Sequence, residues 1–353
     1  MKTTTYNLAL LGFGNVGRAL VSLLERKRQE LRDHHGIEWR LTGVATRRMG
    51  WIAAPEGLDP AALLRGETPA GGPQLNNVRD WLRAARADVL FEITSLNRQT
   101  GQPAIDHLRA ALEVGAHAIT ANKGPVVHGY AELNTLATKA GRRFLFESTV
   151  MDGVPIFCLF RDTLPAVEVR GFRAILNSTT NLVLQHMEEG STLNRAIGKA
   201  QKIGVAETDP SDDLEGWDAA VKVAALVTVL MKMPLKPQQV EREGIENLHP
   251  LAVQAARRAA RPYKLVCEAR RENGAVRASV RPQQLPLSDP LAWVNGTSSA
   301  IYFETDIFPG LAITEVDPGT TETAYGLLAD FVRAVGAVSN GHEPGNRTRT
   351  ASP

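Results

Sequence analysis

The first part of the chain alternates short apolar runs with longer segments of helical periodicity. Four of the runs have the length of strands: Tyr6–Leu11, Trp39–Ala45, Ala87–Thr94 and His117–Thr120. The segments between them, such as Pro103–Val114, show the apolar spacing of helices. Strands that alternate with helices predict a parallel sheet with helices on both of its faces.

A second set of apolar runs, with the alternation typical of strands, follows Phe144–Glu147, where we expect the first sheet to close. These runs are Val167–Leu176, Tyr263–Ala269, Val276–Val280 and Ala300–Glu304. Their alternation predicts an open mixed sheet. The fold class is therefore α/β, with an N-terminal Rossmann-type parallel sheet domain followed by an α+β domain.

Two domains fit the 353 residues, and we place a dinucleotide-binding domain at residues 1–148 and a second domain at 149–317. The connection from Pro55 to Asn77 is rich in Gly, Pro and Ala and is expected to be irregular. Residues 339–353 are almost free of apolar side chains, which predicts a disordered tail.

Composition and charge narrow the class of protein. Hydrophobic residues make up 43% of the chain, and the net charge of +2 gives no attraction to nucleic acid or to an anionic membrane. No apolar run has transmembrane length, and the short segment before the first strand leads us to expect no signal peptide. Cys158 and Cys267 lie in apolar runs, which indicates buried, reduced thiols in a cytoplasmic protein. A small molecule is the expected partner.

A glycine-rich turn follows the first strand and precedes a helical pattern. It consists of Gly12, Phe13, Gly14, Asn15, Val16 and Gly17. Glycines at this spacing allow a tight turn, the approach of a pyrophosphate and the packing of the helix on the strand. The N-terminus of the helix offers N–H groups to the phosphates. The motif predicts an NAD or NADP site.

The end of the second strand bears on the choice between the two cofactors. Thr46, Arg47 and Arg48 stand where NAD-selective sites place a carboxylate for the ribose hydroxyls. Arginines can instead pair with a 2′-phosphate, which favours NADP. The alternative is that both arginines are surface charges on a loop.

Polar residues also follow two later strands of the predicted parallel sheet. Thr94 and Ser95 come after one strand, and Asn122 and Lys123 after the next. Ligands bind at the carboxyl ends of such strands, so we expect these residues at the cofactor edge. Lys123 precedes a Gly-Pro break and could equally be an ordinary loop lysine.

The segment from Gly204 to Lys222 is acidic and leads into an apolar helix pattern. Asp218 and Lys222 lie four residues apart, on one face of that helix. Such a pair is usually a surface ion pair, but the apolar flank predicts a buried Lys222. Burial lowers the pKa of a lysine, so we expect Lys222 to be a proton donor near neutral pH.

This segment resembles the signature of homoserine dehydrogenases: Gly-x-Ala-Glu-x-Asp-Pro, then Asp-Leu-x-Gly-x-Asp-x-x-x-Lys. The stretches Ala121–Lys123 and Ala174–Asn181 resemble further motifs of that family, and the likeness runs from residue 6 to 338. We expect the short form of the family, without a C-terminal regulatory domain of the ACT type. The resemblance implies NAD(P)-dependent interconversion of L-homoserine and L-aspartate 4-semialdehyde, a step toward threonine and methionine.

The resemblance also implies roles for individual residues. Lys222 would exchange the proton with the substrate oxygen, supported by Lys123, and Glu207 and Asp218 would hold the α-ammonium. Asp218 would in addition orient Lys222. Asn177 and Thr179 would bind the substrate or the nicotinamide amide, although a helix cap is an alternative for these residues.

Further expectations follow from the same resemblance. Gly319 and Glu322 open a helix, at about 318–338, that would return to complete the nucleotide site, while 149–317 would bind substrate and form a homodimer. A monovalent cation, Na⁺ or K⁺, would be held by backbone carbonyls of Glu147, Val150, Asp152 and Val154. Many relatives have Gly-Ala where Met151-Asp152 stands.

Two other functions are open at this point. One is a related NAD(P)-dependent oxidoreductase that acts on another amino-acid aldehyde, against which the acidic segment counts. The other is a catalytically silent nucleotide-binding regulatory protein, against which the joint presence of Lys123, Glu207, Asp218 and Lys222 counts.

Overall fold

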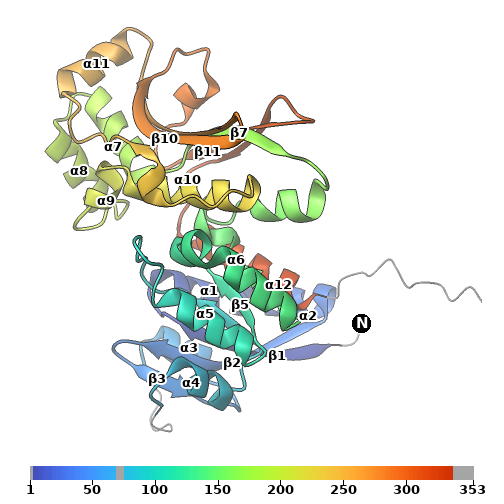
Figure 1. Cartoon of the computed structure of the whole chain (residues 1–353). Coiled ribbons are helices and arrows are strands. Elements are labelled where there is room, and N and C mark those ends of the chain that lie inside the picture. The colour runs from blue at the N-terminus through green and yellow to red at the C-terminus, as the bar shows by residue number, and fades with distance from the viewer. Residues whose placement is uncertain (1–2, 69–74, 337–353) are drawn as a thin grey trace, which may run out of the picture.

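The computed structural model describes residues 3–68 and 75–336. The tail predicted at 339–353, the last residues of the helix predicted to reach 338, and residues 69–74 of the connection lie outside that part of the chain. The described residues form two six-stranded sheets, one above the other in Figure 1.

The first sheet has the order β3-β2-β1-β4-β5-β6 and is parallel except for the antiparallel pair of β2 and β3. Its strands are β1 Thr4–Leu11, β2 Ile37–Thr46, β3 Gly50–Ala53, β4 Val89–Glu92, β5 His117–Thr120 and β6 Phe144–Leu145. The helices around it are α1 Asn15–Arg26, α2 Arg28–His35, α3 Pro60–Leu64, α4 Val78–Ala84, α5 Ala104–Glu113 and α6 Lys123–Lys139. This is the predicted Rossmann-type sheet.

The second sheet has the order β12-β11-β7-β9-β10-β8, and only the pair of β10 and β8 is parallel. Its strands are β7 Val169–Ile175, β8 Glu241–Arg242, β9 Tyr263–Glu272, β10 Ala275–Gln284, β11 Ser299–Thr305 and β12 Leu311–Glu315. Its helices are α7 Ser178–Glu188, α8 Leu193–Lys202, α9 Ser211–Leu214, α10 Trp217–Leu230 and α11 Pro250–Arg258. The open mixed sheet predicted from the alternating runs is confirmed.

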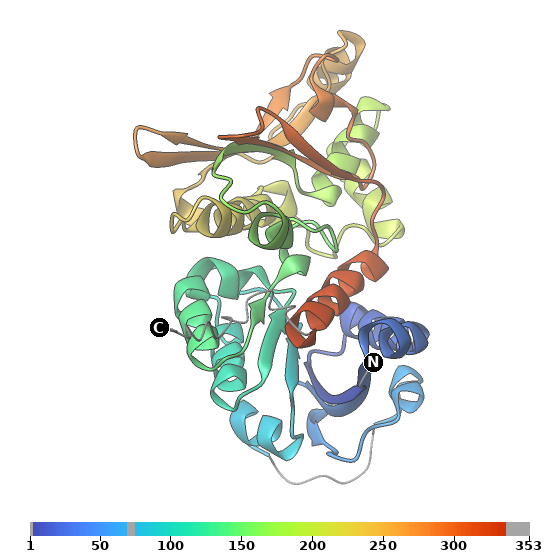
Figure 2. The ribbon, with the colours of Figure 1, turned by 90° about the vertical axis from the view of Figure 1, so that its right-hand side faces the viewer.

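Short helical turns complete the chain. Three are 3₁₀ turns and one is a π-helical turn: η1 Glu147–Thr149, η3 Pro237–Gln239, η4 Pro290–Trp293 and η2 Leu159–Thr163. The last helix, α12 Thr320–Val335, lies beside α1 (Figure 2). There Phe331 is buried and contacts Phe91 edge-on, with 6.1 Å between the ring centroids, so the end of the chain packs into the core of the first sheet.

Some elements differ from the sequence-based expectations. The helical pattern after the glycine turn breaks at Lys27, so that α2 can bury Leu31 and Arg28 can lie over the ring of Trp39 at 4.0 Å. Strand β3 was not expected. A short helix, α3, begins in the connection predicted to be irregular, capped by the side chain of Asp59.

Helix α10 lies between the two sheets and packs against α6 of the first half and against β9 and β10 of the second (Figure 1). Nearly all of its residues are apolar, and nine of them are buried. A helix that is apolar on all sides must be covered on all sides. This burial brings Asp218 and Lys222 to the carboxyl edge of the first sheet.

Candidate active site

A cleft of about 520 Å³ opens between the carboxyl edge of the first sheet and α10. Its walls come from the loops after β1, β4 and β5, from η1 and the residues after it, and from three single side chains, Glu207, Lys222 and Thr323. The site residues predicted from the sequence that line it are Gly14, Asn15, Val16, Gly17, Thr94, Ser95, Asn122, Lys123, Val150, Asp152, Glu207 and Lys222. Segments far apart in the chain therefore meet in one place.

The glycine turn forms one end of the cleft. Gly12 has a φ of +104°, and a Cβ there would lie 2.3 Å from the carbonyl oxygen of Ile93. A Cβ on Gly17 would lie 2.8 Å from the carbonyl oxygen of Gly12, whereas at Gly14 nothing lies within 4 Å. Helix α1 starts after Gly14 without a side-chain cap. Open space beside uncapped N–H groups fits a pyrophosphate, which supports a dinucleotide at this position.

The turn between β2 and β3 lies beside the glycine turn, because the N–H of Gly12 donates to the carbonyl of Ala45 at 2.9 Å. Thr46 ends β2, and its hydroxyl accepts from the N–H of Met49 at 2.9 Å. Arg47 and Arg48 are exposed in the turn. The end of β2 thus presents a hydroxyl and two guanidinium groups where the ribose of the cofactor is expected.

A buried carboxylate that we did not predict organises the next two loops. Glu92, at the end of β4, is fully buried and accepts from the hydroxyl of Thr120 at 2.8 Å and from Thr94. Asn122 donates to the carbonyl of Ser95 at 3.3 Å and caps α6 by accepting from the N–H of Gly124 at 2.9 Å. These bonds hold the cleft edge in one arrangement.

Asp218 lies between two lysines. Its Oδ1 is 3.0 Å from Nζ of Lys123, and its Oδ2 is 3.3 Å from Nζ of Lys222. Lys222 also donates to the carbonyl of Leu176 at 2.6 Å. The three charged side chains are each less than one-fifth exposed. Lys123, which could have been an ordinary loop lysine, is therefore part of a partly buried ion-pair network.

A second carboxylate stands behind this network. Asn177 caps α7, as the alternative interpretation required, and its amide also donates to Asp213 at 2.6 Å and to Asp218 at 3.1 Å. Thr179 donates to the carbonyl of Val205 at 3.3 Å. In the sequence, Asp213 is one of several acidic residues in the segment from Gly204 to Lys222. The sequence does not indicate which of these side chains is buried.

The charges in the network set one another's protonation. Burial acts to raise the pKa of Asp218, but the ammonium groups of Lys123 and Lys222 outweigh it and hold that pKa well below its usual range. Burial raises the pKa of Asp213, and the charge of Asp218 raises it further. Of the two carboxyls, Asp218 therefore loses its proton at the lower pH.

The expectation that burial brings the pKa of Lys222 toward neutrality is wrong. Burial does act to lower it, but the carboxylates of Asp218 and Asp152 outweigh burial, and the pKa of Lys222 lies above its ordinary value. The prediction from the apolar flank left out the counter-charge on the same helix face. Lys222 is an ammonium at neutral pH.

The residues after η1 connect the cleft to α12. Asp152, at a φ of +41°, accepts from the hydroxyl of Thr323 at 2.5 Å. The side chain of Glu147 is buried and accepts from the N–H of Phe157 at 2.6 Å. Among the described residues, no group of three or more His, Cys, Asp or Glu side chains is arranged to hold a metal ion.

The remaining predicted residues lie around the cleft rather than in its wall. Gly319 caps α12, and its N–H donates to the carboxylate of Glu322 at 2.9 Å. Val154 follows η1 and donates its N–H to the carbonyl of Met151 at 2.8 Å. Phe13 lies under the guanidinium of Arg18, 5.2 Å from its ring centroid.

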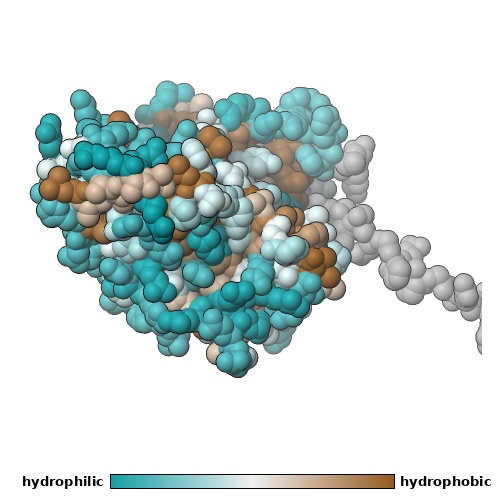
Figure 3. All heavy atoms as spheres, turned by 90° about the horizontal axis from the view of Figure 1, so that it is seen from above, coloured by the Kyte–Doolittle hydropathy of each residue, from teal (hydrophilic) through white to brown (hydrophobic). Residues whose placement is uncertain are grey.

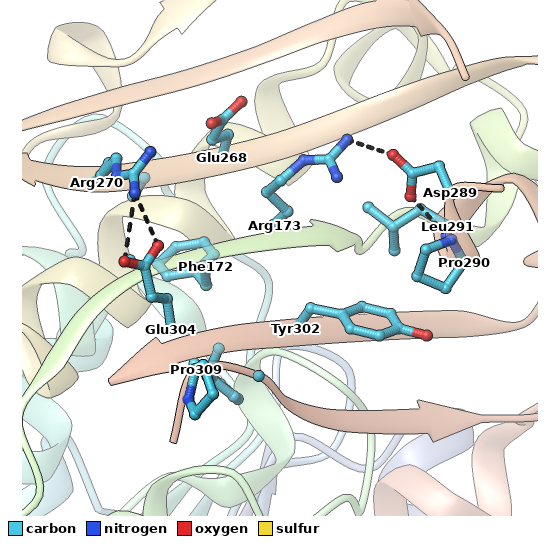
Figure 4. Close-up of a pocket in the computed structure, with 14 residues that line it drawn as sticks. Phe172, Arg173, Glu268, Arg270, Asp289, Pro290, Leu291, Tyr302, Glu304 and Pro309 are labelled. Atoms are coloured by element: carbon cyan, nitrogen blue, oxygen red, sulfur yellow. Dashed lines mark hydrogen bonds and ion pairs between the residues drawn. The ribbon is translucent and has the colours of Figure 1, made fainter. Parts of the chain in front are cut away.

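A second hollow, of about 240 Å³, lies on an exposed face of the second sheet (Figure 4). Four of its five charged side chains pair with one another: Arg173 with Asp289 at 2.9 Å, and Arg270 with Glu304 at 3.0 Å. Side chains that neutralise each other in solvent do not form a catalytic arrangement, so the candidate active site is the cleft at α10.

The parallel sheet, the open glycine turn and the lysine-flanked carboxylate together define a nicotinamide-dependent oxidoreductase. Residues 12–147 match the family model described as the NAD binding domain of homoserine dehydrogenase, and residues 155–332 match the model described as homoserine dehydrogenase. The chain belongs to the homoserine dehydrogenase family. It is an NAD(P)-dependent oxidoreductase that interconverts L-homoserine and L-aspartate 4-semialdehyde.

Known proteins resemble the chain along almost its whole length. The NAD(+)-dependent homoserine dehydrogenase of Pseudomonas canavaninivorans is 35% identical over 93% of this chain and 96% of its own. The homoserine dehydrogenase of Methanocaldococcus jannaschii is 32% identical, over 92% and 97%. The structure of a hyperthermophilic archaeal homoserine dehydrogenase mutant in complex with NADPH is 27% identical, with a TM-score of 0.78 over 94% of this chain and 98% of that one.

Proposed function

We propose that Lys222 is the acid and base of the reaction. When bound, the nicotinamide supplies or accepts the hydride. A hydride that arrives at an aldehyde carbon leaves negative charge on the oxygen, which an adjacent cation stabilises. The Lys222 ammonium has three N–H donors, and Leu176 and Asp218 engage two of them. No other acceptor among the described residues engages the third, so it can donate to the substrate oxygen, and this arrangement carries the proposal.

We assign to Asp218 the positioning of the two lysines. Each of its oxygens already faces an ammonium, Lys123 on one side and Lys222 on the other. Glu207 lines the cleft and is exposed, which supports it as the main anion for the substrate α-ammonium. Asn177 holds Asp218 by a hydrogen bond, and Thr179 lies in the first turn of α7, which Asn177 caps.

The assignment of Lys222 is tested by Lys222→Met, with Lys139→Met as the matched control because Lys139 is an exposed helical lysine. Lys222→Met should lower kcat by about a hundredfold or more, the low end of general acid catalysis, with the cofactor Kd unchanged. Lys139→Met should behave as wild type. A Lys222→Met enzyme that keeps most of its kcat removes Lys222 from the chemistry.

For the cofactor, we infer that the residues of the glycine turn from Gly12 to Gly17 hold the pyrophosphate and that NADP binds more tightly than NAD. Arg47 and Arg48 at the end of β2 support a contact with the 2′-phosphate. The relatives differ, since the Pseudomonas enzyme is named NAD(+)-dependent and the archaeal structure contains NADPH. Tight binding of NADP is compatible with slow release and faster turnover with NAD.

We also propose the division into domains at 1–148 and 149–317, with the helix at about 318–338 completing the first. The packing of α12 against α1 supports it. A monovalent cation at the carbonyls of Glu147, Val150, Asp152 and Val154 remains a proposal from the family likeness. A dependence of activity on Na⁺ or K⁺ is its test.

A homodimer in the cytoplasm completes the proposal. The second sheet exposes one face, on which Arg173, Arg270 and Glu304 are 38%, 56% and 44% exposed in their side chains. The molecule viewed from the side of this sheet is mainly hydrophilic, with hydrophobic residues in small groups (Figure 3). Among the described residues, none of the helices has the length and apolar character to span a membrane. Sedimentation equilibrium at a mass other than twice the chain would contradict the dimer.

A further inference from the structure

Arg98 connects the first half of the chain to the second. It lies in the loop between β4 and α5, and its guanidinium forms an ion pair with Asp212 of α9. The loop is held from within, because the side chain of Asn97 accepts from the N–H groups of Gln99 and Thr100, each at 3.1 Å. The carbonyl of Arg98 lies 2.9 Å from Nε2 of His128 on α6. Arg98 therefore projects from a well-anchored loop.

The same guanidinium lies over the indole of Trp217, 4.9 Å from the ring centroid. Arg242 lies over that indole too, at 3.8 Å. Trp217 is the first residue of α10, and its Nε1 donates to the carboxylate of Glu215 at 3.2 Å. Arg242 belongs to the same half of the chain as Trp217, whereas Arg98 belongs to the other half. Only the contact with Arg98 therefore joins the two halves.

Both partners of Arg98 are sequence neighbours of carboxylates in the site. Asp212 precedes Asp213, and Trp217 precedes Asp218. Asn177 bridges these two carboxylates, and Lys123, at the start of α6 in the first half, pairs with Asp218. A shift of the turn between α9 and α10 relative to the first sheet would change the distance from Asp218 to Lys123.

We propose that Arg98 is a positioning residue for the reaction, which fixes the turn between α9 and α10 against the first sheet so that Asp218 stays in register with Lys123 and Lys222. The inference rests on the role proposed for Asp218 and Lys222. Arg98 itself does not line the cleft, so its effect on catalysis acts through that turn. An ordinary surface ion pair would contribute little, but here the pair is combined with a cation–π contact at a junction between the two halves.

The test compares Arg98→Met with Arg242→Met, which removes the other cation from Trp217 and a hydrogen bond to the carbonyl of Glu215 but leaves the contact between the two halves of the chain in place. Arg98→Met should lower kcat/KM for homoserine about tenfold, or about 1.4 kcal/mol, with the cofactor Kd within about twofold of wild type. Arg242→Met should stay within about twofold. Equal losses in both variants, or an equal loss of cofactor affinity, would overturn the proposal.

Asp212→Asn removes the ion pair from the other side and guards against misfolding of a single variant. If the pair acts as proposed, the double variant Arg98→Met/Asp212→Asn should be no less active than Arg98→Met alone, since both changes remove one contact. Additive losses would overturn the proposal. A wild-type kcat in Lys222→Met would refute the role of Lys222 as acid and base. The single and double variants at Arg98 and Asp212 measure the coupling of that pair without relying on the result for Lys222→Met.

Discussion

Replacing Asp218 by Asn tests the central ion-pair network most directly. The change keeps the shape of the side chain but leaves the ammonium groups of Lys123 and Lys222, 3.0 and 3.3 Å from the present carboxylate, without their shared counter-charge. Breaking a buried pair by removal of one partner costs roughly 3–5 kcal/mol. Because the three side chains keep some contact with solvent, we expect a loss of about 2–4 kcal/mol in the free energy of unfolding.

The same variant should change the pH dependence of the rate. The Asp218 carboxylate favours the charged form of Lys222, so its removal lowers the pKa of Lys222. Oxidation of homoserine needs Lys222 to accept a proton. The rate of oxidation therefore rises with pH as the Lys222 ammonium loses its proton. In Asp218→Asn this rise should begin at lower pH, while the limiting kcat falls by about a hundredfold.

The assay combines thermal unfolding with kcat measured from about pH 6 to 10. The double variant Asp218→Asn/Lys123→Met is the control, because removal of one of the two unpaired ammonium groups should restore part of the stability but not the activity. An Asp218→Asn protein with the melting temperature and the pH profile of wild type would refute the reasoning.

Three further predictions concern other parts of the molecule. Glu207→Gln should raise KM for homoserine much more than the cofactor Kd, and equal effects on both would indicate a folding role for its loop. Arg47→Ala should lower the ratio of NADP to NAD affinity, and an unchanged ratio would make Arg47 a surface charge. Burial and the charge of Glu147 raise the pKa of Asp330 to about 7, so the native state binds an extra proton between about pH 4 and 7. The free energy of unfolding of the wild-type protein should therefore fall as pH rises through that range. The melting temperature of Asp330→Asn should vary less with pH, and an equal dependence of the melting temperature on pH in both proteins would contradict this.

Local patterns were sufficient for most strands of the two sheets and for the glycine turn, but not for β3, β8 or β12. The turn from Gly12 to Gly17 needs backbone conformations and close approaches that only glycine allows, so the sequence alone reveals the motif. The sequence also predicts that Asp218 and Lys222 lie close together, because a spacing of four residues places both side chains on one face of a helix. The start of α12 at Thr320 lies within the helix that the family likeness placed at about 318–338, whereas the apolar pattern alone does not contain the cap at Gly319.

The protonation and the partners of the site depend on contacts between segments remote in sequence. Lys123 reaches Asp218 only because the apolar surface of α10 packs against α6, and no local pattern encodes that distance. Asp212 and Asp213 are adjacent and chemically identical, yet one pairs with Arg98 at the surface and the other bonds to Asn177 inside. Charge interactions depend on separation and on burial, and both are properties of the packed chain, which is why the pKa of Lys222 moved opposite to the direction inferred from its neighbours in sequence.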